Sequence, residues 1–326
     1  MIRGGKDAAA IAEAARVIRA GGLVGFATET VYGLGADASS DTAVAGIFAA
    51  KGRPSDHPLI VHVADPAQVA DYAVDIPPFA ERLMKALWPG PLTVILKRQP
   101  GIAAAAAGGQ NSIGLRCPAH PVAQALLKAC ATGVAAPSAN RFGRVSPTTA
   151  RHVADEFGDD LLVLDGGACE VGIESSIVDC TRGRPVLLRP GVFSRMQLEA
   201  ACGEPVLSND ELLDAAAPRA SGTLESHYAP TAKVRLMDAA AIQAALDLLG
   251  TDAAHIAVYA RSIVRITSDK VMYRRMPDDA LATAQQLFAV LRGFDAQGVK
   301  LIWIEHPPPG PEWDGVRDRL GRAAAD

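Results

Sequence analysis

The sequence predicts an α/β protein in two parts, a larger sheet domain and a smaller C-terminal domain with Rossmann-like α/β alternation. Short runs of Val, Ile and Leu alternate with segments of helical periodicity along most of the chain. Residues 205–230 lack a sustained strand pattern and are broken by Pro and Gly, which is typical of a linker. We therefore predict a first domain at residues 1–204 and a second at 231–326.

The individual elements follow from caps and apolar patterns. A first helix is expected to start after Asp7, to bury Ile11, Ala15 and Ile18, and to end at Gly21-Gly22. The rest of the first domain is predicted to contain strands at 23–26, 58–63, 92–96, 112–116, 134–136, 161–165, 176–179 and 185–189, and helices at 41–50 and 121–130. The second domain is predicted to contain strands at 233–237, 255–259, 271–274 and 300–305, and helices at 239–249, 278–295 and 314–324.

Composition limits the class of protein. The 326 residues are 49% hydrophobic and 21% charged, which supports a sizeable core and argues against disorder. A net charge of -4 gives no global attraction to nucleic acid. The five cysteines form no CxxC pair, so neither a zinc site nor a disulfide framework is indicated, and a reducing cytoplasmic location is expected. No apolar run is long enough to cross a membrane.

Charge is distributed unevenly along the chain. The stretch from Arg82 to Ala154 contains nine Lys or Arg and no Asp or Glu. A region of one sign attracts anions such as ATP or an RNA backbone. The alternative is a sheet core whose few surface charges happen to be basic.

Several standard signatures are missing. The sequence has no GxxxxGK[ST] phosphate loop, no HExxH and no GxSxG. Gly33-Leu34-Gly35 resembles the start of a dinucleotide fingerprint, with Ala38 at the place of the third glycine or alanine. However, polar or bulky residues separate this motif from the preceding strand, which argues against a fingerprint. His57 and His62 lack a convincing third ligand, so no metal site is predicted.

Polar side chains gather where predicted strands end. The turn expected after strand 23–26 carries Thr28 to Asp37, and Lys51 and Arg53 flank a glycine after a helix. Both cations suit phosphates, although cations at a helix end also favour the helix dipole. His62 ends a strand and is either a core residue or part of the same pocket. These features predict a site for an anionic small molecule beyond the strand ends.

Further candidates come from later strands and loops. Arg116 ends a buried strand, and either a substrate carboxylate, which we favour, or an internal aspartate would satisfy its charge. The loop 136–148 is either an ordinary polar loop or a set of donors for phosphate and ribose. Arg189 ends another strand, and Tyr228 either closes over a ligand or anchors the linker.

Five strings occur in an order that resembles the YrdC-type threonylcarbamoyl-AMP synthases. They are Thr28-Glu29-Thr30-Val31-Tyr32-Gly33-Leu34, Lys51-Gly52-Arg53-Pro54, Pro58-Leu59-Ile60-Val61-His62, Pro137-Ser138-Ala139-Asn140 and Ser146-Pro147-Thr148. His227-Tyr228-Ala229-Pro230 followed by a small α/β domain resembles the longer, two-domain branch. The resemblance implies an open twisted sheet with a positively charged concave face. It also implies synthesis of threonylcarbamoyl-AMP from L-threonine, bicarbonate and ATP, with magnesium, for tRNA modification by downstream proteins.

The resemblance also implies roles for single residues. Threonine would be held by Thr30, His62, Arg116, Ser138 and Ser175. ATP would be held by Arg53, His57, Ser112, Asn140, Ser146, Arg189 and Tyr228, with Lys51 facing the phosphates and Lys51 and Arg53 as the catalytic cations.

The chain departs from the family pattern at three places. Ala27 replaces a proline, His57 replaces an asparagine, and Ser221 to Ser226 replace a proline-glycine-methionine run. Two other functions are weighed against the synthase: a double-stranded RNA-binding module without catalysis, and a carbamoyltransferase of the hydrogenase-maturation type. The first leaves the hydroxyl-rich loops and His62 unexplained, and the second requires zinc-finger modules for which the chain has no CxxC.

Overall fold

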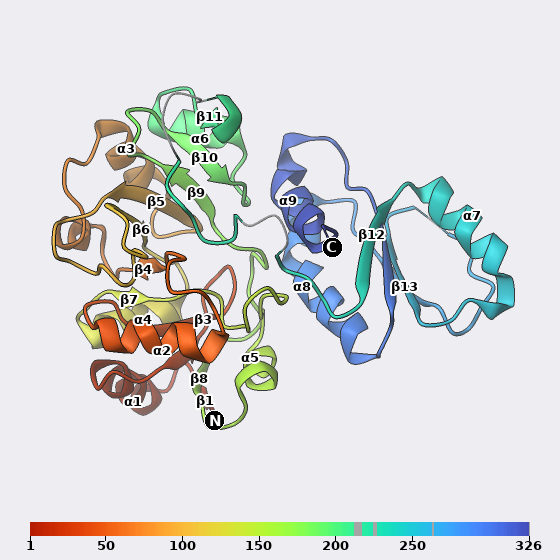
Figure 1. Ribbon diagram of the computed structural model, residues 1–326, viewed down its shortest axis with the longest axis horizontal. Coiled ribbons are helices and arrows are strands. Elements are labelled where there is room, and N and C mark those ends of the chain that lie inside the picture. The colour runs from red at the N-terminus through yellow and green to blue at the C-terminus, as the bar shows by residue number, and fades with distance from the viewer. Residues whose placement is uncertain (212–216, 224–226, 263, 326) are drawn as a thin grey trace. The chain divides into compact units, whose positions relative to one another are not determined.

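The structure is a computed structural model that describes residues 1–211, 217–223, 227–262 and 264–325. The chain forms two compact units (Figure 1). The first comprises Met1–Phe142 and Ser146–Thr223, and the second comprises Gly143–Val145 and the described residues beyond Thr223. The divergent run Ser221 to Ser226 lies partly outside the described residues, which exclude 224–226.

The first unit is built on a mixed eleven-stranded sheet with the order β1-β8-β2-β3-β7-β4-β6-β5-β9-β10-β11. It combines parallel pairs such as β4·β6 and β5·β9 with antiparallel pairs such as β5·β6 and β3·β7. Its strands are β1 (Ile2–Gly4), β2 (Val24–Phe26), β3 (Gly33–Asp37), β4 (Ile60–His62), β5 (Leu92–Lys97), β6 (Ser112–Arg116), β7 (Val134–Ala135), β8 (Leu162–Asp165), β9 (Ser176–Asp179), β10 (Val186–Arg189) and β11 (Leu207–Ser208).

Five of the six described helices of this unit begin at side-chain caps that the sequence supplies, and α3 does not. Asp7 accepts a hydrogen bond from the Ala9 amide at the start of the first helix, as predicted, and Ser40 caps the second. Gly52 ends the second helix in the left-handed region, at φ 64°. The helices are α1 (Ala8–Arg19), α2 (Asp41–Lys51), α3 (Pro78–Leu87), α4 (Pro121–Cys130), α5 (Ala150–Phe157) and α6 (Arg195–Cys202).

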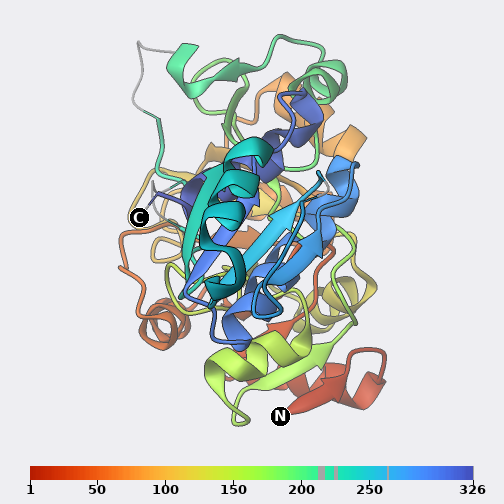
Figure 2. The same ribbon diagram turned by 90° about the vertical axis from the view of Figure 1, so that its right-hand side faces the viewer.

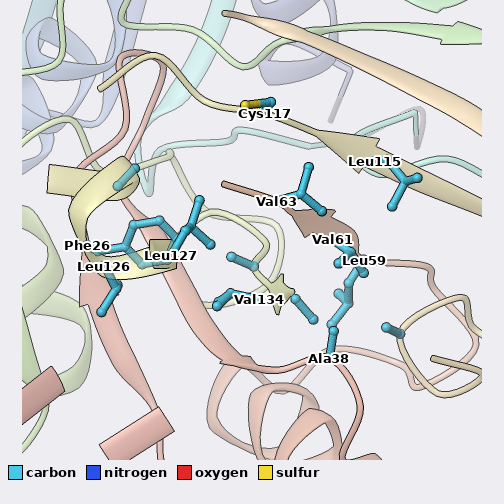
Figure 3. Close-up of a cluster of buried hydrophobic side chains, with 14 of the residues drawn as sticks. Phe26, Ala38, Leu59, Val61, Val63, Leu115, Cys117, Leu126, Leu127 and Val134 are labelled. Atoms are coloured by element: carbon cyan, nitrogen blue, oxygen red, sulfur yellow. The ribbon is translucent and has the colours of Figure 1, made fainter. Parts of the chain in front are cut away.

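The core lies between the sheet and these helices. Figure 3 shows part of it, a cluster that includes Leu59 and Val61 of the β4 region, Leu115 of β6, Val134 of β7 and Leu126 of α4. All five side chains are at most 1% exposed. Burial of each such side chain contributes about 1.5–3 kcal/mol, so this packing fixes where the strand ends lie.

One local prediction was wrong. Residues 33–37, which glycines and neighbouring polar residues made look like a turn, form the antiparallel strand β3 next to β2. The glycines permit close packing: a Cβ on Gly35 would lie 2.8 Å from Val134 and 2.9 Å from Phe26. Strands β1 and β11 and helices α3, α5 and α6 were not predicted, and most of them are short.

The second unit has an all-parallel four-stranded sheet with the order β12-β15-β13-β14. Helix α7 covers one face of this sheet, and α8 and α9 lie on the other (Figures 1 and 2). This is the Rossmann-like alternation that the sequence predicts. Its elements are β12 (Lys233–Met237), α7 (Ala239–Leu249), β13 (Ile256–Ala260), β14 (Met272–Arg275), α8 (Ala280–Ala296), β15 (Leu301–Glu305) and α9 (Asp314–Ala323).

Candidate active site

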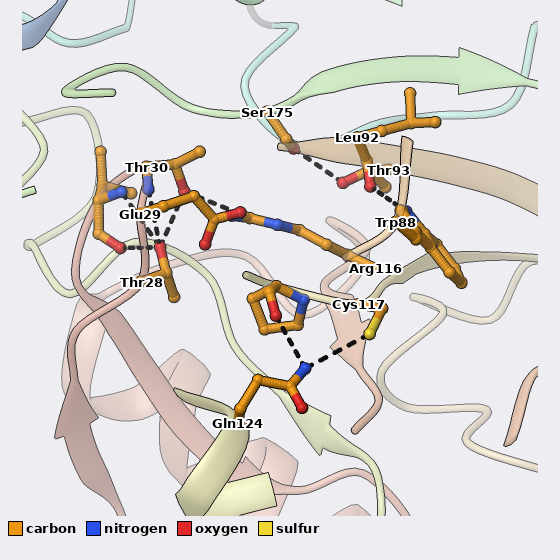
Figure 4. Close-up of polar contacts among 12 residues, drawn as sticks. Thr28, Glu29, Thr30, Trp88, Leu92, Thr93, Arg116, Cys117, Gln124 and Ser175 are labelled. Atoms are coloured by element: carbon orange, nitrogen blue, oxygen red, sulfur yellow. Dashed lines mark hydrogen bonds and ion pairs between the residues drawn. The ribbon is translucent and has the colours of Figure 1, made fainter. Parts of the chain in front are cut away.

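Three strand ends of the first unit bring polar side chains together. Thr30 follows β2, while His62 and Arg116 end the neighbouring parallel strands β4 and β6 and are register partners. The Arg116 guanidinium donates from Nη1 to Thr30 Oγ1 over 2.8 Å (Figure 4). Packing of the strands therefore places three residues of the expected threonine set side by side.

The charge of Arg116 is balanced by a residue of the same cluster. Arg116 Nη2 lies 2.6 Å from Glu29 Oε1, and both side chains are at most 7% exposed. The sequence left open whether a substrate carboxylate or an internal aspartate satisfies this arginine, and the structure supplies an internal glutamate. Burial alone would raise the pKa of Glu29, but the Arg116 charge and hydrogen bonds lower it overall.

Polar atoms in this cluster stay unpaired. Among the described residues, Glu29 Oε2, Arg116 Nε and His62 Nδ1 are buried without a hydrogen-bond partner. Burial lowers the pKa of His62 to about 3, and the Arg116 charge adds to the effect, so the imidazole is neutral near pH 7. Buried polar atoms are normally paired, so these three atoms mark a place for a ligand or bound water.

Lys51 organises the loop that carries Ser138 and Asn140. Its Nζ donates to the Ser138 carbonyl over 2.6 Å and to the Asn140 carbonyl. Burial, followed by the Arg53 charge, lowers the pKa of Lys51 well below its usual value. The Lys51 side chain thus connects two strings of the expected site through backbone carbonyls.

Arg53 lies in a second cluster of the same unit. Its guanidinium donates to the Pro58 carbonyl and to Ser221 Oγ, over 3.0 and 3.3 Å, and lies 5.8 Å from the Phe142 ring centroid. His57 contacts the same ring edge-on, with centroids 5.5 Å apart. Arg53 and His57 therefore contact the same Phe142 ring. This contact connects the segment of Arg53 and His57 with the loop 136–148, and both were predicted to bind ATP.

A hydrogen-bond chain connects the expected threonine and ATP residues. Arg189 donates from Nη2 to Ser175 Oγ over 3.1 Å, and Ser175 Oγ lies 2.8 Å from Thr93 Oγ1. Arg189 Nη1 also donates to the Ser221 carbonyl over 2.8 Å. One arginine thus contacts a predicted threonine-binding residue and the segment that Arg53 also touches.

The other ATP candidates lie in varied settings. Ser112 lines a pocket together with Thr93 and Ser221. Ser146 Oγ donates to the Glu174 carboxylate, directly before Ser175 in sequence. Tyr228 belongs to the second unit, where it stacks on Phe288 with centroids 5.5 Å apart.

Among the described residues, four of the nine cations in the single-sign stretch pair with acids from outside it. Arg82 pairs with Glu204, Lys97 with Asp75, and Arg151 with Asp155. Together with the Glu29–Arg116 pair, these contacts reduce the field that the sequence alone would suggest.

Two residues in the cluster had received no role from the sequence. Glu29 lies within the string Thr28 to Leu34. The feature that could have identified it is an acidic residue between two threonines beside a strand end. Thr93 lies in the apolar strand β5 with 0% exposure, and its signal was a hydroxyl inside a run of Leu, Val and Ile. Among the described residues, no group of three or more His, Cys, Asp or Glu is arranged to hold a metal ion, and no helix is long and apolar enough to cross a membrane.

Comparison with known proteins adds to this geometry. The Sua5/YciO/YrdC family model, described as "Telomere recombination", matches residues 16–191. A second model, described as "Threonylcarbamoyl-AMP synthase, C-terminal domain", matches residues 193–325. Threonylcarbamoyl-AMP synthases of Pyrococcus abyssi and Bacillus subtilis are 39% and 37% identical, over 95% and 96% of this chain and 93% and 92% of theirs.

Solved structures agree with the sequence relatives. Pyrococcus abyssi Sua5 crystallised with L-threonine superposes with a TM-score of 0.88 at 36% identity, over 96% of this chain and 94% of that one. Escherichia coli YciO, at 24% identity and a TM-score of 0.52, covers 61% of this chain and 97% of its own, and it shares the fold of that part. The chain therefore belongs to the Sua5/YciO/YrdC family, in the form that carries the Sua5 C-terminal domain.

Proposed function

We propose that this chain is an enzyme that makes threonylcarbamoyl-AMP from L-threonine, bicarbonate and ATP and releases pyrophosphate. The observation that carries the proposal is the cluster of Thr30, His62 and Arg116, which presents unpaired buried atoms at the strand ends. Relatives of nearly equal length bear the name of this synthase, and one of them was crystallised with L-threonine.

The threonine end is proposed to use charge and shape. Arg116 binds the substrate carboxylate through Nε, the donor left without a partner among the described residues. His62, neutral near pH 7, faces the substrate hydroxyl, and Thr30, Ser138 and Ser175 complete the set. These are all residues of the first unit.

The nucleotide end is proposed to receive ATP as its magnesium complex. Arg53, Ser112, Asn140, Ser146 and Arg189 bind it from the first unit. His57, which replaces the family's asparagine, offers a ring nitrogen beside Phe142. Tyr228 belongs to the second unit and stays a separate prediction, and Lys51 fixes the loop at Ser138 and offsets charge on the phosphates.

Positioning and charge stabilisation are sufficient for the chemistry. The threonine amine and bicarbonate give a carbamate and water. A carbamate oxygen then attacks the α-phosphate, and pyrophosphate leaves. No protein nucleophile is required for either step. Downstream proteins would use the product to modify tRNA in the cytoplasm.

Pyrophosphate release from ATP tests the proposal. Release should require both L-threonine and bicarbonate, and omission of either should reduce it to background. L-serine should be a poor rather than an impossible substrate, because one methyl group supplies only about 1–3 kcal/mol of discrimination. Salt-sensitive RNA binding without ATP consumption would instead support the RNA-binding alternative, and equal turnover of serine and threonine would contradict the threonine assignment.

A further inference from the structure

The ion pair between Glu29 and Arg116 is only half formed. The Nε–H and Nη2–H groups of a guanidinium share one edge, so a bidentate pair engages both carboxylate oxygens. Here only Nη2 and Oε1 are in contact, over 2.6 Å. Glu29 Oε2 and Arg116 Nε are buried and have no partner among the residues that the structure describes.

The two unused atoms need opposite partners. Oε2 accepts a hydrogen bond and carries negative charge, whereas Nε donates one and carries positive charge. Leaving such atoms buried and unpaired is costly, so a bound group must supply a donor and an acceptor. An α-amino acid zwitterion has both, separated by a single carbon atom.

We propose that Glu29 binds the ammonium group of the amino-acid substrate through Oε2, while the substrate carboxylate pairs with Arg116. Glu29 is then a specificity-determining residue that selects an amino acid over a carboxylic acid without an amine. This inference deepens the proposed function and rests on its threonine site.

The charges of the cluster are consistent with this assignment. Glu29 and Arg116 balance each other, and the neutral His62 adds no charge. A zwitterion preserves this balance when it binds. A carboxylic acid without an amine would instead add an uncompensated negative charge next to a buried carboxylate.

The test compares two ligands by isothermal titration calorimetry of the full chain. L-Threonine carries the ammonium group, and (R)-3-hydroxybutanoate has the same carboxylate and hydroxyl without it. We expect the native protein to prefer L-threonine. Glu29→Gln keeps the shape but loses the charge, so it should weaken L-threonine binding roughly 10- to 150-fold. The same variant should bind (R)-3-hydroxybutanoate as well as, or better than, the native protein.

Glu305→Gln provides a matched control. Glu305 is as buried as Glu29, at 5% exposure, and pairs with Arg261, but both of its oxygens have partners. This variant should retain the native preference for L-threonine. Melting curves of both variants show whether each one folds.

Each outcome decides between two accounts. Equal loss of both ligands in Glu29→Gln would mean that Glu29 only orients Arg116, and an unchanged preference would mean that bound water fills the gap; either result overturns the inference. Equal affinity of the native protein for both ligands also overturns it, even if Glu29→Gln does not fold. Failure of the native protein to bind L-threonine would instead refute the threonine site of the proposed function, and the inference with it.

Discussion

Two buried glutamates, one in each unit, show how similar ion pairs differ. Glu29 and Glu305 are both 5% exposed, and each pairs with an arginine at the end of a strand or just after one. Glu305 Oε1 accepts from Arg261 and from the Ser262 hydroxyl, and its Oε2 accepts from the Ser262 amide over 2.7 Å. At Glu29, Oε1 accepts from Arg116, backbone hydrogen bonds from Glu29 and Ala119 also lower the pKa of the carboxyl, and Oε2 has no partner among the described residues.

The difference separates a structural ion pair from one that is set to receive a ligand. Around Glu305, backbone and hydroxyl donors satisfy both carboxylate oxygens, although Arg261 Nε has no partner among the described residues. Around Glu29, the fold provides the burial but leaves the hydrogen bonding incomplete. Burial and the presence of an ion pair therefore do not distinguish the two glutamates, whereas the partners of their carboxylate oxygens do.

Removal of each arginine should give the largest contrast in stability. Arg116→Met leaves the Glu29 carboxylate without its charged partner and should lower the free energy of unfolding by about 3–5 kcal/mol. Arg261→Met leaves Glu305 with both Ser262 donors and should cost about 1.5 kcal/mol. Urea denaturation of both variants measures the two values. Equal losses of unfolding free energy would contradict the distinction between Glu29, whose Oε2 has no partner among the described residues, and Glu305, whose carboxylate oxygens are both paired.

The Arg116→Met substitution can also be measured in the Glu29→Gln variant. Adding Arg116→Met to Glu29→Gln removes the uncompensated charge, so the cost of the arginine substitution should fall by more than half. An undiminished cost would assign the loss to packing of the Arg116 side chain instead.

His62 should make the stability of the protein depend on pH, with an effect smaller than that of Arg116→Met and larger than that of an exposed ion pair. Its pKa in the folded chain is about 3, below the usual value of 6.5, so the unfolded chain binds the proton first as pH falls. The contribution to stability is complete above about pH 6.5 and is lost at about 1.4 kcal/mol per pH unit below it. Denaturation between pH 6.5 and 5 should show a shallower decline for His62→Gln than for the native chain. Parallel declines would place a charged imidazole in the folded state.

An exposed ion pair sets the baseline and should show the smallest effect. Arg82 and Glu204 are 2.9 Å apart, with side chains 46% and 40% exposed. Glu204→Gln should change the free energy of unfolding by no more than about 1 kcal/mol, because solvent screens the pair. A loss as large as that of Arg116→Met would show that burial does not govern these pairs.

Local patterns predicted the regular elements well and the irregular ones poorly. Helix α4 occupies Pro121–Cys130 as predicted, because apolar periodicity is a local property. Strand β3 was missed because Gly33 and Gly35 read as turn residues, and only their neighbours Phe26 and Val134 explain why glycine is needed there. The strings around Thr30, Arg53 and Asn140 pointed to an anion site through their polar side chains, and to threonine and ATP through resemblance.

The sequence by itself determined the α/β class, the main helices and strands, and the family to which the chain belongs, because each depends on nearby residues or short strings. Only the tertiary structure decided the partners of single atoms. It paired Arg116 with Glu29, 87 positions away in the chain, and gave Lys51 Nζ the Ser138 carbonyl, also 87 positions away. Such contacts depend on how the strands of the sheet are ordered, and that order is set by burial summed over the whole core.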